Sequence, residues 1–435
     1  MERYINSFAT ENDIQIALQN GELLKPYVAY IEDVDRIDWN SKDKVDYATE
    51  YLTFNILSAG TINWTASNTA ITKTIDYKVN DGEWTSITSN TGSSAPTITV
   101  NSGDKVQFKG NNEQYTTSYS AYNSFSGSTA LFEAEGNIMS LIYGDNFKNN
   151  STISSTYAFA SLFRNCTKLV SAKNLILPAT TLADYCYDDM FNKCTSLTIA
   201  PVLPATTLAN GCYNSMFVSC TSLTTAPALP ATTLANYCYS TMFYGCTSLT
   251  SVPVLPATTL APNCYYSMFN GCSSLTTAPE LPATTLAKNC YYHMFKNCTS
   301  LTTAPALPAT VLADECYRRM FWGCTKLTTV PSNLLPATTL KESCYREMFY
   351  VCTNLTNAPE LPATTLAALC YDGMFYGCTS LNYIKCLATN ISATYCTSGW
   401  VYGVASSGTF VKNPNMASWT TGPSGIPTGW TVQDA

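Results

Sequence analysis

The most regular hydrophobic pattern of the chain lies in its second half. One unit, starting at Leu208, has the sequence Leu-Ala-Asn-Gly-Cys-Tyr-Asn-Ser-Met-Phe-Val-Ser-Cys-Thr-Ser-Leu-Thr-Thr-Ala-Pro-Ala-Leu-Pro-Ala-Thr-Thr. Between Cys186 and Cys378 the cysteines alternate at steps of eight and eighteen residues, so the unit recurs every 26 residues. One unit is two residues longer, within residues 332–335. A period in this range is typical of proteins that stack their units in a solenoid.

The apolar residues of this unit fall on one side of a helical wheel. At about 100° per residue, six of them lie within an arc of roughly 140°: Cys212, Tyr213, Met216, Phe217, Cys220 and Leu223. The opposite side carries the positions that vary most between units, which are Asn214, Ser215, Val218 and Ser219. The pattern therefore predicts a helix on one side of each coil.

Prolines mark the other half of the unit, for example Pro227 and Pro230. Because proline lacks an N–H donor and has a fixed φ, this half should be extended or irregular, with a very short strand. One unit cannot bury its apolar stripe alone, whereas stacked units form a continuous core. An incomplete first unit, with Ala158 in place of the first cysteine, begins near residue 155, and the repeat decays beyond Cys378. We assign residues 151–386 to the solenoid.

The nineteen cysteines of the chain form two columns in such a stack. Eight residues of helix span about 12 Å, which is beyond the reach of a disulfide. We therefore predict free, buried thiols. A zinc or redox site would need convergent ligands such as paired Cys-x-x-Cys motifs, and the sequence has none, so we predict no metal and no cofactor.

Residues 46–150 have a different pattern, in which short runs of alternating Thr, Ile, Val and aromatic residues are separated by Asn, Asp and Gly. The pattern predicts about seven short strands, including residues 52–56, 75–79, 84–87, 97–100 and 105–108. This number of strands over a hundred residues is typical of an immunoglobulin-like β-sandwich, here without cysteine. The predicted fold class is thus α+β and multidomain.

The two ends of the chain carry separate segments. In residues 1–45 a helix is expected after Thr10 and a strand from Tyr27, but so short a segment rarely has a stable core, so it should pack on a partner. Residues 387–435 contain Trp400, Trp419 and Trp430. We interpret this tail as a cap that buries its aromatic rings over the last coil; an exposed sugar-binding cluster is the alternative.

Composition excludes several functions. The net charge of −7 argues against nucleic-acid binding, which needs clustered Lys and Arg. The first residues have no basic segment leading into an apolar run, so we expect no secretory leader unless processing removed one, and no run approaches the roughly 18 apolar residues of a membrane span. His293 is the only histidine, and we expect it to face solvent from the helix. The candidate acids, Asp188, Asp189, Glu315 and Glu347, are scattered over different coils, so we predict no catalytic residues.

Binding is better supported, by the position directly after each Met-Phe pair. The wheel places this position opposite the buried arc, where packing does not require an apolar residue. Aromatic residues nevertheless occupy it in four of eight units: Tyr244, Trp322, Tyr350 and Tyr376. Exposed aromatics suit contacts with sugars or proteins. Scattered surface aromatics, or lateral packing in an oligomer, are the alternatives.

The pattern Met-Phe-x-x-Cys-Thr-Ser-Leu followed by Leu-Pro-Ala-Thr-Thr-Leu resembles the BspA-type leucine-rich repeats of surface proteins from gut bacteria and some of their phages. This resemblance covers about half of the chain and implies a right-handed solenoid that binds rather than catalyses. A second resemblance, through residues 4–10, 25–30 and 33–39, is to the N-terminal segment of virion proteins from crAss-like Bacteroides phages, which implies an attachment module. Its candidate attachment residues are Ile14, Leu18, Tyr27 and Trp39.

These observations lead to three hypotheses. The first is a phage virion protein, a fibre or decoration on head or tail. It would be assembled in the host cytoplasm, held to other virion proteins by residues 1–45, and would contact a host glycan or protein; phage fibres suggest a homotrimer. The second is a BspA-like adhesin on the bacterial cell surface, and the third a polysaccharide-degrading tail protein.

Overall fold

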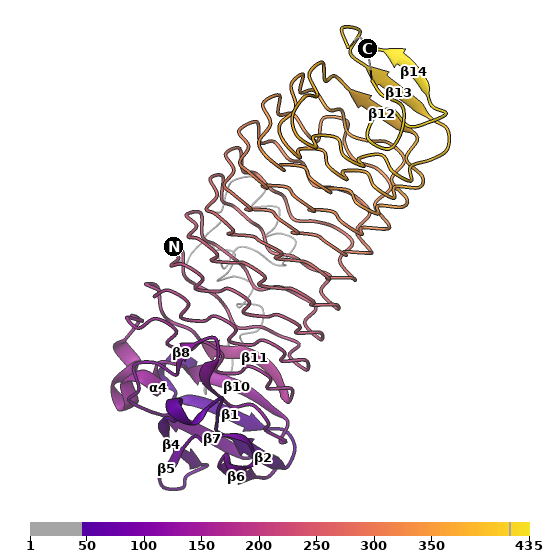
Figure 1. Ribbon diagram of the computed structural model, residues 1–435. Helices are drawn as coiled ribbons and strands as arrows, with labels where there is room; N and C mark the ends of the chain where they lie inside the picture. Colours follow the sequence, from indigo (N-terminus) through magenta and orange to yellow (C-terminus); the bar gives the residue numbers. More distant parts are fainter. Residues whose placement is uncertain (1–45, 417–418) are drawn as a thin grey trace, which may run out of the picture. The chain divides into compact units, whose positions relative to one another are not determined.

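The computed structural model describes residues 46–416 and 419–435. Residues Tyr47–Ala435 form one compact unit with several β-sheets and little helix (Figure 1). The predictions for residues 1–45, including the attachment residues Ile14, Leu18, Tyr27 and Trp39, lie outside the described residues. In the described part of the chain, no helix has the length and apolar character needed to cross a membrane.

We call the sheets formed by strands β1 to β11, within residues 52–176, the β region. Its main sheet has six strands in the order β11-β10-β1-β7-β4-β5. Its strands are β1 (Leu52–Ile56), β4 (Thr74–Val79), β5 (Thr85–Thr88), β7 (Lys105–Lys109), β10 (Phe132–Asn137) and β11 (Leu169–Ile176). Two small sheets pair β2 (Gly60–Asn63) with β6 (Thr97–Val100), and β9 (Ala121–Ser124) with β3 (Thr65–Ala66) and β8 (Thr116–Ser118). Short helical turns are η3 (Tyr47–Thr49), η4 (Thr69–Ile71), η5 (Gly92–Ser94), α4 (Ser140–Tyr143) and η6 (Gly144–Asn149). The five strands predicted from residue 52 to 108 are present within one residue of their predicted ends.

Alternation explains these strands, because each places apolar side chains on one face. In β6, Ile98 and Val100 are buried while their threonine neighbours are exposed. The buried side chains meet around Phe54, whose ring lies 4.7 Å from that of Phe108 and 4.5 Å from that of Phe132. This core continues into the repeats, since β11 follows residue 150 and pairs in parallel with β10.

The side of each coil that was predicted to be helical is instead a chain of overlapping turns, so the helix prediction is wrong. In residues 183–194 the N–H groups of Cys186, Asp188 and Met190 bond to carbonyls three residues back in the same coil. The N–H groups of Tyr185, Tyr187 and Asp189 alternate with them and bond to the next coil. We call this segment and its counterparts in the other coils the turn ribbon.

The turn ribbon differs from a helix because every fourth residue has positive φ. In its first full copy these residues are Tyr185, Asp189 and Lys193, with φ between 56° and 60°. A left-handed residue at the third position of a β-turn stops helix propagation and frees every second N–H to bond outward. The apolar pairs of the unit therefore repeat every four residues, and residues 212, 213, 216, 217 and 220 all face inward.

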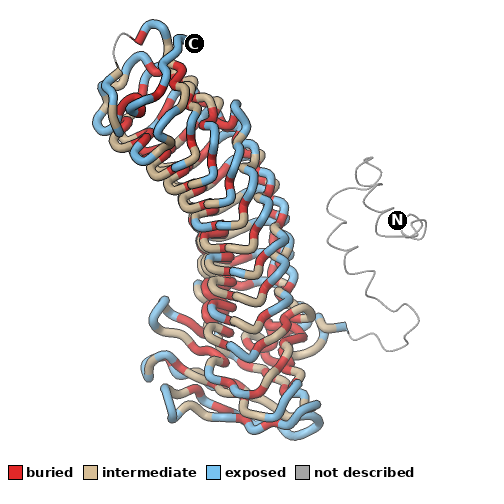
Figure 2. Tube along the Cα trace, turned by 90° about the vertical axis from the view of Figure 1, so that its right-hand side faces the viewer, coloured by how far each residue is buried: buried red, intermediate tan, exposed pale blue. Residues whose placement is uncertain are grey.

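The proline-containing half of each coil forms isolated parallel bridges, such as Thr181 to Thr207 and Thr207 to Thr233. This agrees with the extended, strand-poor structure predicted from the prolines. Between the two halves, equivalent side chains stack on one another. Tyr213 and Tyr239 have ring centroids 6.0 Å apart and Phe217 and Phe243 5.7 Å apart, with rings parallel within 3°. Buried positions follow the inside of every coil (Figure 2).

All nineteen cysteines are free and buried, as predicted. In the second cysteine column each thiol donates a hydrogen bond to the main chain of the preceding coil, as Cys246 Sγ does to Phe217 O at 3.1 Å. Burial raises the pKa of the Cys246 thiol to about 12. These thiols therefore stay protonated and act as small apolar side chains.

At the C-terminal end, β12 (Tyr383–Cys386) of the last coil pairs in parallel with β13 (Thr409–Lys412) of the tail, and β13 pairs in parallel with β14 (Thr431–Asp434). Trp400 is fully buried and Trp430 is 7% exposed, while Trp419 packs on Trp400 with ring centroids 5.8 Å apart. The three indoles are packing residues, so they do not form the exposed sugar-binding cluster considered as an alternative.

Candidate functional site

The outward side chains of the turn ribbon form the most varied surface of the repeats. Inward positions hold the same Cys, Tyr, Met and Phe in coil after coil, whereas the position after Met-Phe varies, for example Val218, Tyr244 and Trp322. Its asparagines, Asn192 and Asn270, are buried. The backbone is held by hydrogen bonds within and between coils. Outward side chains are consequently free to differ without cost to the fold.

Three of the four predicted binding residues lie together on this face. The rings of Trp322 and Tyr350 stack with centroids 4.0 Å apart, and those of Tyr350 and Tyr376 with centroids 4.6 Å apart. Tyr402 continues the column 4.8 Å from Tyr376. We call these four residues the aromatic ladder. Tyr402 was missed because the repeat was taken to decay beyond Cys378, although it lies 26 residues after Tyr376.

Tyr244, the fourth predicted residue, is not part of the aromatic ladder. The same position in the two following coils holds Asn270, which is buried, and Lys296. Tyr244 is 43% exposed and is separated from Trp322 by these two non-aromatic residues. The prediction of one continuous set of binding residues therefore holds only from Trp322 onward.

Cations cover the first ring of the ladder. Lys296 Nζ lies 5.0 Å from the centre of the Trp322 ring and the Arg319 guanidinium 4.8 Å from it. Arg319 also forms an ion pair with Glu347 of the next coil. Desolvation, followed by the nearby Arg319, lowers the pKa of Lys296. These contacts make the start of the ladder a mixed cationic and aromatic surface.

His293 was predicted to face solvent, but it is partly buried beside a second stack of rings. Tyr266 and Tyr292 stack 4.9 Å apart, and the imidazole lies 4.1 Å from the Tyr292 ring. Burial, and then Lys296 and Arg319, lowers the pKa of His293 to about 3. Its Nε2 has no hydrogen-bond partner among the described residues. The imidazole is thus neutral and packed, and no carboxylate of residues 46–416 or 419–435 hydrogen-bonds to it as in a catalytic triad.

The candidate acids are held by structural partners. Glu315 pairs with Arg318 at 2.7 Å, and Asp189 with Arg164 at 3.0 Å. Asp188 accepts a hydrogen bond from Asn214 at 2.7 Å, and desolvation raises its pKa to about 7, with Asp189 adding a smaller effect. Both aspartates are buried. Within the described residues no group of three metal-ligating side chains is present.

The stacked coils with their buried leucines and variable outer face define a leucine-rich repeat protein. The family model described as "BspA type Leucine rich repeat region (6 copies)" matches residues 142–276, 212–348 and 265–397, which together exceed half of the chain. The chain belongs to this family. No curated protein matches it.

Proposed function

We propose that this protein is a non-enzymatic, adhesin-like surface protein that contacts its target through the aromatic ladder and the cations beside it. The BspA-type repeats favour a surface protein of this kind. The observation that carries the proposal is the ladder itself. It is a run of stacked rings on the one side of the turn ribbon where neither the core nor the main-chain hydrogen bonds require aromatic residues.

The composition of this face suits a contact with a macromolecule. At protein interfaces, the few residues that contribute most of the binding free energy are enriched in Trp, Tyr and Arg. This face carries all three types: Trp322, Tyr350, Tyr376, Arg318 and Arg319. The arginines are already fixed by ion pairs with Glu315 and Glu347. Side chains fixed before binding lose less conformational entropy when a partner arrives.

Adhesion of labelled protein to a panel of gut bacterial strains tests the proposal. We expect the triple variant Trp322→Ala, Tyr350→Ala, Tyr376→Ala to bind at least roughly tenfold more weakly than the natural protein. The matched control is Val254→Ala, which removes a residue that is 72% exposed on the proline-containing half of a coil. Normal adhesion by the folded triple variant would contradict the proposal.

Two settings are proposed for this activity, and different parts of the chain support them. Residues 1–45 resemble a virion segment, which favours a solenoid fibre or head decoration on a phage particle, as a homotrimer. Membership of the repeats in the BspA-type family favours a bacterial cell surface. Mass spectrometry of purified virions separates the two settings. In the first setting, deletion of residues 1–45 abolishes incorporation of the chain into particles.

The immunoglobulin-like nature of residues 46–150 also stays a proposal. Its support is the set of antiparallel strands around the Phe54 core. A polysaccharide-degrading activity is not favoured by any observation at the aspartates, because both are buried and paired with neutral amides or arginine.

A further inference from the structure

The rings of the aromatic ladder differ in how many of their faces are covered. Tyr350 lies between Trp322 and Tyr376, and Tyr376 lies between Tyr350 and Tyr402, so both faces of these two rings are covered. The outer face of Trp322 is covered by Lys296. Tyr402 stacks on Tyr376 with one face only and is 54% exposed. Of the ladder rings, Tyr402 alone has no second ring or cation stacked on it among the described residues, which leaves one face for a ligand.

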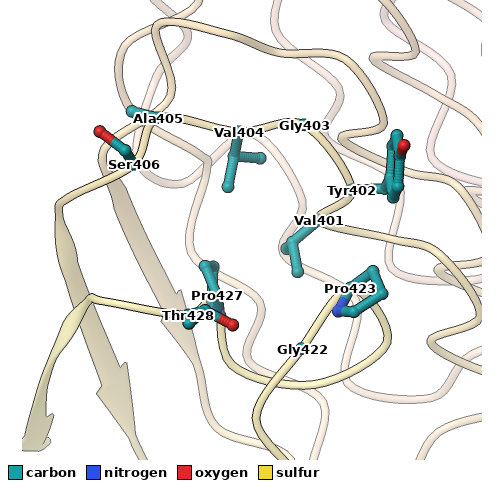
Figure 3. Close-up of a pocket in the computed structure, with 10 residues that line it drawn as sticks. All are labelled: Val401, Tyr402, Gly403, Val404, Ala405, Ser406, Gly422, Pro423, Pro427 and Thr428. Atoms are coloured by element: carbon teal, nitrogen blue, oxygen red, sulfur yellow. The ribbon is translucent and has the colours of Figure 1, made fainter.

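Tyr402 borders a pocket of about 240 Å³ at the C-terminal end of the repeats (Figure 3). The pocket lies between the last turn ribbon and the tail segment that covers it. Its apolar wall is formed by Val401, Val404, Pro423 and Pro427. None of the residues that line it carries a charge.

The rim of the pocket carries two hydroxyl groups, on Ser406 and Thr428. Both residues are exposed, and their hydroxyls form no hydrogen bond with another described residue. Each can therefore donate to or accept from a ligand.

Indole hydrogen bonds hold the walls of the pocket in place. Trp400 Nε1 donates to Gly425 O at 2.8 Å, and Trp430 Nε1 donates to Ala405 O at 2.8 Å. Both indoles are buried. The two segments that line the pocket are thus fixed to each other before any ligand binds, which favours a preorganised site.

A free aromatic face, an uncharged lining and hydroxyls at the rim match the chemistry of a neutral sugar. A pyranose ring presents C–H groups on one face, which pack on an aromatic ring, and hydroxyl groups around its edge. The volume equals that of roughly eight water molecules at about 30 Å³ each, which leaves room for one such ring. We propose that this pocket binds one neutral pyranose residue, packed on Tyr402 at one side of the pocket and bordered by Thr428. The inference rests on the proposed function in one respect: the bound sugar is taken to belong to the target surface to which this protein adheres.

Titration of the full chain with methyl pyranosides of glucose, galactose, mannose and N-acetylglucosamine, followed by saturation-transfer NMR, tests the site. We expect at least one glycoside to bind, and Tyr402→Ala to weaken its binding by at least roughly tenfold. Tyr402→Phe keeps the ring face and should bind within about threefold of the natural protein. Tyr244→Ala, which removes an exposed tyrosine at the same repeat position, is the matched control and should bind unchanged.

Two results would overturn the site: no binding by any of the four glycosides, or equal binding by Tyr402→Ala with an unchanged unfolding midpoint. The adhesion assay separates this failure from failure of the proposed function. If glycosides do not bind but the triple ladder variant loses adhesion, the pocket proposal fails and the adhesion proposal stands. If glycosides bind and the triple variant adheres normally, the reverse holds.

Discussion

The β region and the repeats bury apolar side chains in different ways. Around Phe54 the core consists of side chains that have no repeated equivalents along the chain. The Phe54 ring packs against three rings from different segments: Phe108, Phe125 and Phe132. In the repeats, a ring such as Phe269 touches its equivalents one coil before and one coil after, Phe243 and Phe295. A core of the second kind can be extended coil by coil, and it leaves the outward positions free for binding residues.

The largest expected effect compares these two cores directly. Phe54→Ala and Phe269→Ala should each reduce the free energy of unfolding by about 3–5 kcal/mol, since both remove a fully buried ring. Hydrogen exchange should then differ between them. Phe54→Ala should speed amide exchange across the β region, whereas Phe269→Ala should act mainly on the coils next to it. Equal acceleration in distant coils would contradict the nearest-neighbour account.

A second comparison concerns the junction of the two regions, where Asp188 is buried. Its pKa is about 7 in the folded protein, which is above the ordinary value of 3.8, so the folded state binds its proton more tightly. The contribution of Asp188 to stability should therefore be greatest below about pH 4 and be lost as pH rises to about 7, by at most about 4 kcal/mol. Asp188→Asn keeps an acceptor for Asn214 and should reduce this pH dependence of the denaturation midpoint. An unchanged slope would show that other groups cause it.

A glycine-to-alanine substitution should change stability in opposite directions in the turn ribbon and in a helix, and this smaller effect distinguishes the two. Gly271 has φ of 78°, and an added Cβ would meet only the Gly245 main chain at 3.6 Å or more. Gly271→Ala should therefore cost about 1–2 kcal/mol through backbone strain alone. In a helix the same change would stabilise by about 1 kcal/mol. Val351→Gly, at φ of 58°, should show the opposite change in unfolding midpoint to Gly271→Ala.

Much of this fold was predictable, because alternation and the cysteine period are strong signals. The strands β1 and β4 to β7 and the inward set Cys212, Tyr213, Met216 and Phe217 follow from sequence. The helix was wrongly predicted because periods of 3.6 and 4 place these four residues on the same side. The eight-residue step between Cys212 and Cys220 is two whole periods of four but not of 3.6, and it is the signal that separates the two.

The candidate site was predicted in part, for a related physical reason. The 26-residue period identifies Trp322, Tyr350 and Tyr376 as one column. Coverage of the ring faces could not be predicted, because it depends on the separation of the coils and on side-chain rotamers. The Tyr402 pocket depends in addition on Pro423 and Pro427, which follow no repeat.

Thiol counting tests most directly whether identical side chains are buried between stacked coils. The natural protein should show no reaction with a thiol reagent under native, non-reducing conditions, because every cysteine is buried and its pKa is raised. After denaturation without reductant, all nineteen should react. Rapid labelling of the folded protein, or fewer than nineteen reactive thiols after denaturation, would contradict the stacked, disulfide-free structure.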